Sequence, residues 1–385
     1  MQLDNILSQH KKVATPFFHY DIAILKETLK VLKSESDKYG FEVHYALKAN
    51  TNDKILTTVQ SFGLGADCVS GNEIKKAIEC GFSAKEIVFA GVGKSDEEIN
   101  IALDNDILCF NCESIQELEV INELAEAKNK QANVALRLNP NVNANTHKYI
   151  TTGLEENKFG INFWELDEVL AAMQPLKNVK LIGLHFHIGS QITDLAAYKS
   201  LCLKVNDVQK WFNSHHINIE HINVGGGLGV DYHNPDANGI ADFATYFKLF
   251  DEFLDLRPGQ KVHFELGRAV VAQCGTLLSK VLYIKKGVNT NFAILDAGMT
   301  ELLRPALYQA YHKIENLSNT NDGEMKKYDV VGPICESSDC FGKAVDLPET
   351  KRGDILAIRT AGAYGEVMSS AYNLRDKAEV VYSGE

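Results

Sequence analysis

Between about residue 41 and residue 268, short apolar runs alternate with longer stretches whose apolar residues recur at helical spacing. Short runs rich in β-branched and aromatic residues, separated by amphipathic segments, are typical of parallel βαβ units. Ser, Asp or Asn near the starts of the intervening segments favour helix N-termini. Eight runs qualify as strands: FEVHYALK (41–48), GLGADCV (63–69), EIVFAG (86–91), DILCFN (106–111), NVALRLNP (133–140), LIGLHFHIG (181–189), IEHINVGG (219–226) and KVHFELGR (261–268).

This strand count favours one of two architectures. Eight strands with interleaved helices over about 250 residues match a (β/α)8 TIM-type barrel in number and size. A doubly wound open sheet is the alternative, because strand count alone does not prove closure. We predict a barrel over residues 21–270.

The pattern of apolar and polar residues changes after residue 270. Short runs such as GTLLSKVLYIKKG, NFAILDAG and DILAIRTAGAYG are broken by Gly, Pro, Asn and Asp, without long helical spacing. This pattern predicts a β-rich second domain over residues 271–385. The first 20 residues, with the extended-looking TPFFHY, are too few to fold alone and are expected to join it, giving an α/β barrel plus a β-domain.

Composition narrows the function classes. The 385 residues are 45% apolar and 23% charged, and 39 basic against 51 acidic residues give a net charge of −12. This charge repels phosphate backbones and anionic membranes, so nucleic-acid binding is disfavoured. Neither a signal-like start nor an apolar stretch of membrane-spanning length is present, so a cytoplasmic protein is expected.

The eight cysteines are scattered through a long chain, so we expect thiols rather than a disulfide framework. Cys109 and Cys112 form one CxxC in a run that resembles a buried strand. A second pair or a nearby histidine would be needed for a zinc set, and neither is present. We therefore predict no metal site.

Polar residues stand at the carboxyl ends of several predicted strands, where the active sites of barrels lie. Lys48 ends the first strand, Asp67 is late in the second, His187 ends the sixth, and Glu265 and Arg268 end the eighth. Each could be a solvated strand end when taken alone. Their joint placement predicts an active site.

Three features in this set suit one cofactor. Lys48 is flanked by Ala46, Leu47 and Ala49, which favours imine formation by its amine, although a surface lysine is the alternative. The run NVGGGLG (223–229) offers backbone that can approach a phosphate closely, although it is neither a Walker motif nor GxGxxG and an ordinary turn remains possible. Glu265 could pair with a pyridine nitrogen, or form a salt bridge with Arg268. A lysine, a phosphate cradle and an acid are what pyridoxal 5'-phosphate requires.

Seven motifs in order give a resemblance over almost the whole chain: YALKAN (45–50), HFHIGSQI (185–192), NVGGGLG, ELGR (265–268), LLRPALY (302–308), CESSD (335–339) and GAYG (362–365). They resemble the diaminopimelate decarboxylase family. That family has an alanine-racemase-like barrel followed by a β-domain and uses pyridoxal 5'-phosphate. One departure is Leu266, where the family usually has proline.

The resemblance implies a role for each matching residue. Lys48 would hold the cofactor covalently and Cys335 would be the catalytic acid. Cofactor contacts are implied for Lys48, Asp67, His187, Ser190, Gly225, Gly226, Gly227, Glu265, Gly267, Arg268 and Tyr364. Substrate contacts are implied for Arg268, Arg304, Tyr308, Glu336 and Tyr364.

Two arginines bear on the substrate. A guanidinium fork matches a carboxylate, so Arg268 with Arg304 suggests an amino acid with a second carboxylate far from the reacting carbon. The resemblance then implies conversion of meso-2,6-diaminopimelate to L-lysine and carbon dioxide, the last step of lysine synthesis. It also implies a homodimer in which CESSD of one chain completes the other chain's site.

Alternatives stay open at this point. A related decarboxylase of ornithine, arginine or carboxynorspermidine shares the scaffold, and a racemase is conceivable. A non-catalytic pyridoxal-phosphate-binding protein is a different class, against which the residues after 270 argue. The long connection 141–160 exceeds the usual loop length and is expected to order over the site as a lid.

Overall fold

The computed structural model describes residue 6 and residues 12–142, 158–319 and 324–384. The chain divides into two compact units. We call one the barrel unit, which comprises Leu29–Gly229 and Asp242–Gly267. We call the other the β unit, which comprises Met1–Thr28, Val230–Ala241 and Arg268–Glu385.

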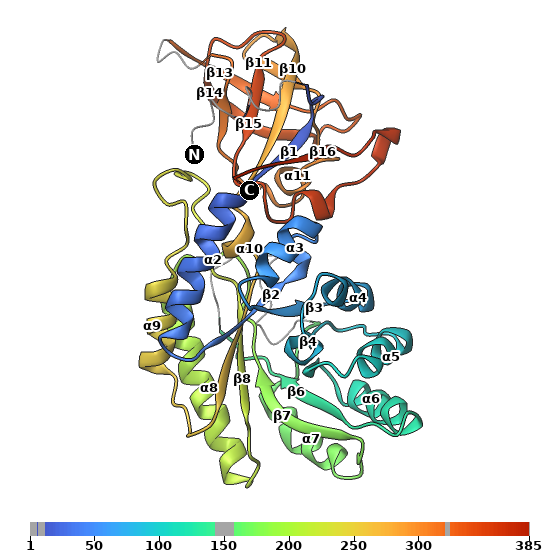
Figure 1. Ribbon diagram of the computed structural model, residues 1–385. Helices are drawn as coiled ribbons and strands as arrows, with labels where there is room; N and C mark the ends of the chain where they lie inside the picture. The colour runs from blue at the N-terminus through green and yellow to red at the C-terminus, as the bar shows by residue number, and fades with distance from the viewer. Residues whose placement is uncertain (1–5, 7–11, 143–157, 320–323, 385) are drawn as a thin grey trace. The chain divides into compact units, whose positions relative to one another are not determined.

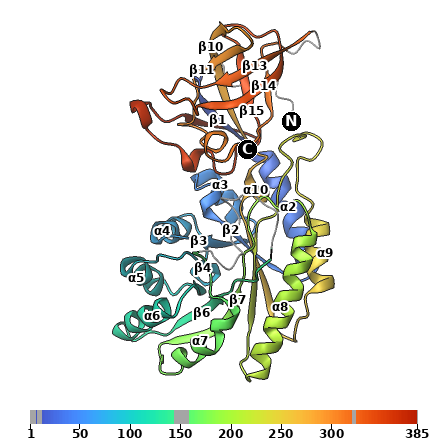
Figure 2. The same ribbon diagram turned by 180° about the vertical axis from the view of Figure 1, so that it is seen from behind.

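The barrel unit confirms the predicted architecture, because its parallel strands close on themselves through pairing of the first with the last (Figures 1 and 2). The open-sheet alternative is thereby excluded. The strands in barrel order are β2 (Glu42–Ala46), β3 (Gly65–Cys68), β4 (Ile87–Phe89), β5 (Cys109–Cys112), β6 (Ala132–Arg137), β7 (Val179–His185), β8 (His221–Gly226) and β9 (Lys261–Leu266).

Helices surround these strands, and short polar side chains begin several of them (Figure 1). Ser70 and Ser114 each accept a hydrogen bond from a backbone N–H of the first turn, and Ser95 forms a complete capping box with Glu98. The helices are α2 (Ile22–Asp37), α3 (Asp53–Gln60), α4 (Gly71–Glu79), α5 (Asp96–Asp104), α6 (Ile115–Ala127), α7 (Leu166–Met173), α8 (Ala196–Ser214) and α9 (Phe243–Phe253).

Strand alternation gives the barrel an apolar outside and a polar inside. In β9, Phe264 points outward and packs edge-on against Phe247 and Phe250 of α9, with ring centroids 4.9 Å apart in both pairs. Its neighbours His263 and Glu265 point inward and are buried. The barrel interior therefore contains ionisable groups that must be paired.

The β unit is built around an eight-stranded sheet with the order β12-β15-β10-β11-β13-β14, to which β1 adds beside β10 and β16 adds beside β1. The N-terminal strand thus joins the same sheet as the C-terminal one. The elements are β1 (Phe17–Asp21), α10 (Arg268–Val271), β10 (Gly275–Lys286), β11 (Asn291–Leu295), α11 (Arg304–Tyr308), β12 (Ile314–Asn316), β13 (Met325–Val331), β14 (Cys340–Pro348), β15 (Ile355–Ile358) and β16 (Glu379–Ser383).

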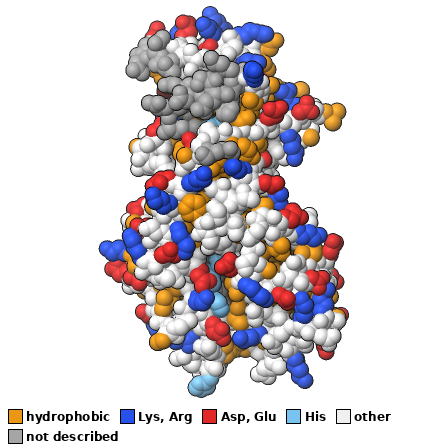
Figure 3. Space-filling view, in the orientation of Figure 1, with side chains coloured by type: hydrophobic (Ala, Val, Ile, Leu, Met, Phe, Trp, Pro, Cys, Tyr) orange, Lys and Arg blue, Asp and Glu red, His pale blue; other side chains and the backbone are white. Residues whose placement is uncertain are grey.

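The surface charges, the cysteines and the helix lengths add three observations. Basic and acidic side chains are interspersed on the face drawn in Figure 3. All eight cysteines are free thiols, and Cys109 and Cys112 are buried at the two ends of β5. Within the described ranges, every helix is too short or too polar to cross a bilayer.

Candidate active site

Lys48 and Asp67 meet at the carboxyl end of the barrel strands. Lys48 lies in a short 3-10 turn (Leu47–Ala49) directly after β2, because pairing of β2 with β3 and β9 ends by Ala46. Its Nζ is 3.5 Å from Oδ2 of Asp67. The Lys48 side chain is 40% exposed and that of Asp67 is fully buried. Lys48 is therefore just beyond the strand that the sequence predicts it to end, with its amine accessible.

Glu265 is fixed inside the barrel by donors from three other strands. Asn111 and Asn223 donate to Oε1 over 3.1 and 2.7 Å, and His185 Nε2 is 2.9 Å from Oε2. A carboxylate has about four acceptor sites, so one remains for a further donor. Burial alone would raise the pKa of Glu265, but His185 and then Lys48 more than offset it and hold the pKa below its usual value. Glu265 is thus an ionised carboxylate that can accept one further hydrogen bond.

The pKa of Asp67 is shifted in the opposite direction from that of Glu265. Burial, and next the nearby charge of Glu265, raise the pKa of Asp67 despite the opposing effect of Lys48. Its Oδ1 is buried and, within the described residues, has no hydrogen-bond partner. Two carboxyl groups in one site therefore differ in protonation, which is a recurrent property of active sites.

His187 lies two residues beyond β7 rather than at its end. Its Nδ1 accepts a hydrogen bond of 3.3 Å from the backbone N–H of Gly226. Burial, followed by the charges of Lys48 and Arg137, holds the pKa of His187 well below the ordinary value. The ring is therefore neutral and oriented by the glycine run.

The glycine run has a shape that only glycine allows. A Cβ on Gly226 would lie 1.8 Å from the backbone oxygen of Glu265, and Gly225 and Gly227 have φ of +70° and +96°. The N–H of Gly225 donates to Asn223 Oδ1, and that of Gly226 is used by His187. Donors for an anion must therefore come from the later part of the run, beginning at Gly227.

Two further predicted residues lie near this run in the barrel unit. Ser190 is half-buried in the loop after β7. Gly267 follows β9, and a Cβ there would lie 2.9 Å from Cβ of Ala49. The absence of a side chain at Gly267 thus lets the chain pass close beside the turn that contains Lys48.

In the β unit, Arg268 and Arg304 lie against the same tyrosine. Arg268 Nη1 donates to the hydroxyl of Tyr232 over 2.6 Å, and the Arg304 guanidinium carbon is 4.8 Å from the centre of the Tyr232 ring. Arg268 also lies over Tyr364, 4.9 Å from the ring centre. Tyr308 is half-buried at the end of α11. Arg268, Arg304 and Tyr364 therefore belong to one arginine–tyrosine cluster, which also contains Tyr232.

Arg304 is buried and oriented by a neutral base. Its Nη1 donates to His312 Nε2 over 2.8 Å, and His312 Nδ1 donates to the carbonyl of Arg359. Burial and the charge of Arg304 lower the pKa of His312 to about 3, so the imidazole is an acceptor at neutral pH. None of the ion pairs in the described part of the chain includes Arg304. A buried guanidinium without an anion is costly, and an anionic ligand removes that cost.

Cys335 and Glu336 are exposed on one turn of the β unit. The backbone N–H of Cys335 donates to Asn373 Oδ1, and the hydroxyl of Tyr372 donates to Glu336 Oε1 over 2.8 Å. The turn is therefore ordered by its own unit while both side chains face outward. Of the predicted lid, residues 143–157 lie outside the described residues.

Several site residues were missed by the sequence analysis. His185, Asn111 and Asn223 position Glu265, whereas Tyr232 and His312 position the arginines. The signal for the first three was available, since each is a polar residue at an inward position of a predicted strand. The other two had no local signal.

These features fit the cofactor predicted from the sequence. An accessible lysine, an ionised buried carboxylate with one acceptor site and a cradle that a Cβ would fill match the aldehyde, the ring nitrogen and the phosphate of pyridoxal 5'-phosphate.

Comparison with known proteins agrees with this choice of cofactor. The family model for the pyridoxal binding domain of pyridoxal-dependent decarboxylases matches residues 24–272. A diaminopimelate decarboxylase of Bacteroides thetaiotaomicron is 58% identical over 96% of this chain and 96% of its own length. One from Helicobacter pylori is 42% identical over 94% of this chain and 89% of its own. The crystal structure of the Helicobacter pylori enzyme complexed with L-lysine has a TM-score of 0.92 at 39% identity, covering 98% of this chain and 94% of that one.

Proposed function

This chain belongs to the pyridoxal-dependent decarboxylases and, among them, to the diaminopimelate decarboxylases, and from that premise we propose how its own residues perform the reaction. The enzyme converts meso-2,6-diaminopimelate to L-lysine and carbon dioxide, the last step of lysine synthesis. Its cofactor is pyridoxal 5'-phosphate.

Bound pyridoxal 5'-phosphate supplies an electron-withdrawing ring that accepts the electrons left when carbon dioxide departs. Lys48 would hold the cofactor covalently through its accessible amine. Glu265 would accept a hydrogen bond from the protonated ring nitrogen at its remaining acceptor site, and its lowered pKa keeps it ionised for that purpose. His187, being neutral, would face the ring without repelling its charge. The run from Gly227, with Ser190, would donate to the phosphate.

The arginine pair is the observation that favours a substrate with a distant carboxylate. Arg304 is buried and aimed by His312, and it forms no ion pair with the described acids. A bidentate carboxylate at this point anchors the far end of diaminopimelate, so that the other end is held for reaction. Ornithine and lysine would present an ammonium group there and be repelled.

Cys335 is proposed to return a proton to the reacting carbon. Because Cys335 and Glu336 are exposed on their own unit, they are available to a second copy of the chain. We propose a homodimer in which this turn completes the site of the partner subunit, with Glu336 contacting the substrate amine.

The test is incubation of the cofactor-loaded enzyme with meso-diaminopimelate, L-ornithine, L-arginine, carboxynorspermidine and L-lysine in parallel. L-Lysine and carbon dioxide are quantified together. Equimolar release from diaminopimelate alone is expected. Comparable turnover of a substrate with one carboxylate would contradict the role of the arginine pair, and a change of configuration without carbon dioxide would indicate racemisation.

A further inference from the structure

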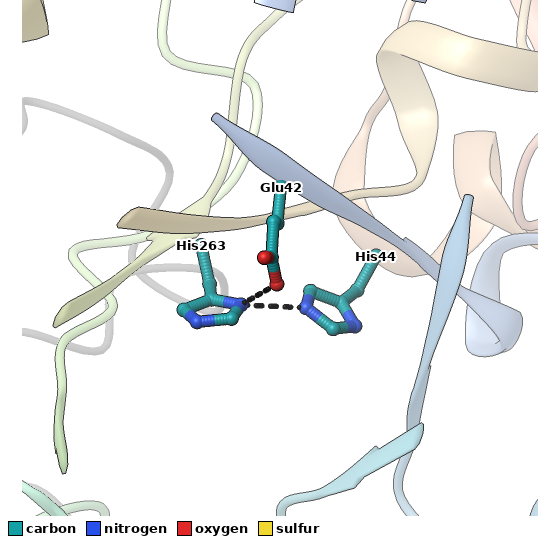
Figure 4. Close-up of side chains that lie close together, drawn as sticks. All are labelled: Glu42, His44 and His263. Atoms are coloured by element: carbon teal, nitrogen blue, oxygen red, sulfur yellow. Dashed lines mark hydrogen bonds and ion pairs between the residues drawn. The ribbon is translucent and has the colours of Figure 1, made fainter. Parts of the chain in front are cut away.

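A second cluster of ionisable side chains lies toward the amino-terminal ends of β2 and β9, and its His44 pairs in register with Glu265. Glu42 and His44 belong to β2, and His263 belongs to β9. Figure 4 shows the three side chains pointing toward one another. One oxygen or nitrogen atom from each lies within 4.8 Å of the other two. Because β2 and β9 are the first and last strands, the cluster lies at the seam where the barrel closes.

The distances suit a metal ion of ordinary bond length. Glu42 Oε2 is 3.4 Å from His263 Nδ1, and His44 Nε2 is 2.9 Å from the same nitrogen. Ligands of a four-coordinate zinc ion, at bonds of about 2.0–2.1 Å, are separated by about 3.3 Å. The ligand atoms of Glu42 and His44 lie within 4.8 Å of each other, so shifts of up to about 1.5 Å would bring the three atoms into coordination.

The outer contacts of both histidines support this arrangement. His44 Nδ1 donates to the carbonyl of Glu86 over 3.0 Å, which leaves Nε2 with its lone pair toward the cluster. His263 Nε2 is 2.7 Å from Nδ1 of His221, to which it can donate when its own Nδ1 binds an ion. Histidine ligands of metals characteristically donate their second N–H to such partners.

The two histidine ligands are buried inside the barrel, whereas the carboxylate ligand is open to solvent. Glu42 is 39% exposed at the end of the cluster, where it also contacts Lys261, and provides access from solvent.

We propose that Glu42, His44 and His263 form a binding site for one divalent first-row transition-metal ion, of which Zn²⁺ is the best fit, at the closing seam of the barrel. Two imidazoles and a carboxylate are ligands that such ions accept, with water completing the coordination. The ion would link β2 to β9 and so stabilise the closed barrel. The ion would take no part in the decarboxylation chemistry itself, although His44 pairs in register with Glu265.

The experiment is equilibrium dialysis of the cofactor-loaded full chain against Zn²⁺, with the retained metal measured per chain. Glu42→Gln and His44→Gln are the test variants. Glu220→Gln is the control, since Glu220 precedes β8, is 48% exposed and pairs with Lys180 in a similar way. One ion per chain is expected for the parent protein and the control. Loss of an outer contact costs about 10–100-fold in affinity, so loss of a ligand should cost about 100-fold or more.

Thermal stability and Co²⁺ absorption test the same site independently. Zn²⁺ should raise the Tm of the parent protein and of Glu220→Gln but not of Glu42→Gln. Co²⁺ should give the visible absorption of a four-coordinate ion in the parent protein and in Glu220→Gln, but not in Glu42→Gln or His44→Gln. Retention of no ion by the parent protein overturns the proposal, as does equal retention by Glu42→Gln.

Discussion

Lys48 is the residue that we propose holds the cofactor covalently. Its amine is accessible and lies beside Asp67, whereas Lys94, for comparison, is buried in an ion pair with Glu117. Lys48→Ala should fold, retain no borohydride-reducible cofactor and lose nearly all turnover, because no other described lysine is placed at this strand end. Absorption before and after reduction, with mass spectrometry, measures the attachment. A covalent adduct that persists in the variant contradicts the assignment.

Arg304 should determine how tightly the substrate binds. Removing it leaves the distant carboxylate unpaired, so Arg304→Ala should weaken diaminopimelate binding by about 2–5 kcal/mol. The effect should be seen mainly in KM. Arg352→Ala is a matched control, since Arg352 is an exposed arginine of the β unit that lies over Tyr283. Equal effects of the two substitutions would rule out a specific role for Arg304.

His312 should make the protein less stable in acid. Its folded-state pKa of about 3 is below the ordinary value of 6.5, so between these pH values the unfolded chain binds a proton that the folded chain excludes. The contribution to stability is thus complete above pH 6.5 and is lost as pH falls toward 3, by up to about 1.4 kcal/mol per pH unit.

The measurement is urea unfolding of the parent protein and of His312→Gln at a series of pH values. Glutamine can accept from Arg304 but does not titrate. The difference in the free energy of unfolding between the two proteins should be constant above pH 6.5 and should shift in favour of the variant below it. A difference that is constant throughout would contradict the prediction.

At the scale of elements, the approach of β8 to β9 depends on the glycine run. A Cβ on Gly226 would meet the backbone oxygen of Glu265 at 1.8 Å, and backbone cannot move aside as a side chain can. Gly226→Ala should therefore separate the strands, cost about 1–3 kcal/mol or more, and weaken cofactor binding. Gly93→Ala is the control, because a Cβ there meets nothing within 4 Å.

Thermal unfolding and titration with pyridoxal 5'-phosphate compare the two variants. Gly93→Ala should match the parent protein in both. If Gly226→Ala also matches the parent protein, the close approach of β8 to β9 does not require glycine at this position.

At the scale of the whole molecule, the proposed dimer predicts complementation between inactive chains. Lys48→Ala lacks the attachment point and Cys335→Ala lacks the proposed acid, whose loss typically costs about 10²–10⁴ in rate. In a mixed dimer, one of the two sites receives both intact residues. Random exchange of equal amounts should restore about a quarter of the parent activity.

Subunit exchange is confirmed by mass spectrometry of differently tagged chains under native conditions. The unmixed variants, treated identically, are the controls. If exchange is complete and activity stays at the level of the unmixed variants, the shared site is wrong, although the decarboxylase assignment stands.

Local patterns in the sequence were enough to predict the eight barrel strands and the polar residues at their carboxyl ends. Alternation, helix caps such as Ser95 and the glycine run depend on interactions within a few residues, so they are readable along the chain. Strand ends were less accurate. Lys48 lies in the turn after β2 and Arg268 begins α10, because strand pairing, and not apolar character, ends a strand.

Barrel closure and long-range packing decided the rest. Asn111, His185 and Asn223 surround Glu265 only because four strands face one interior. His312 orients Arg304 by packing within the β unit. Glu42 and His263 are far apart in the chain and meet where the first strand pairs with the last. Contacts of this kind depend on which distant segments pair, and that is a property of the folded barrel rather than of any stretch of sequence.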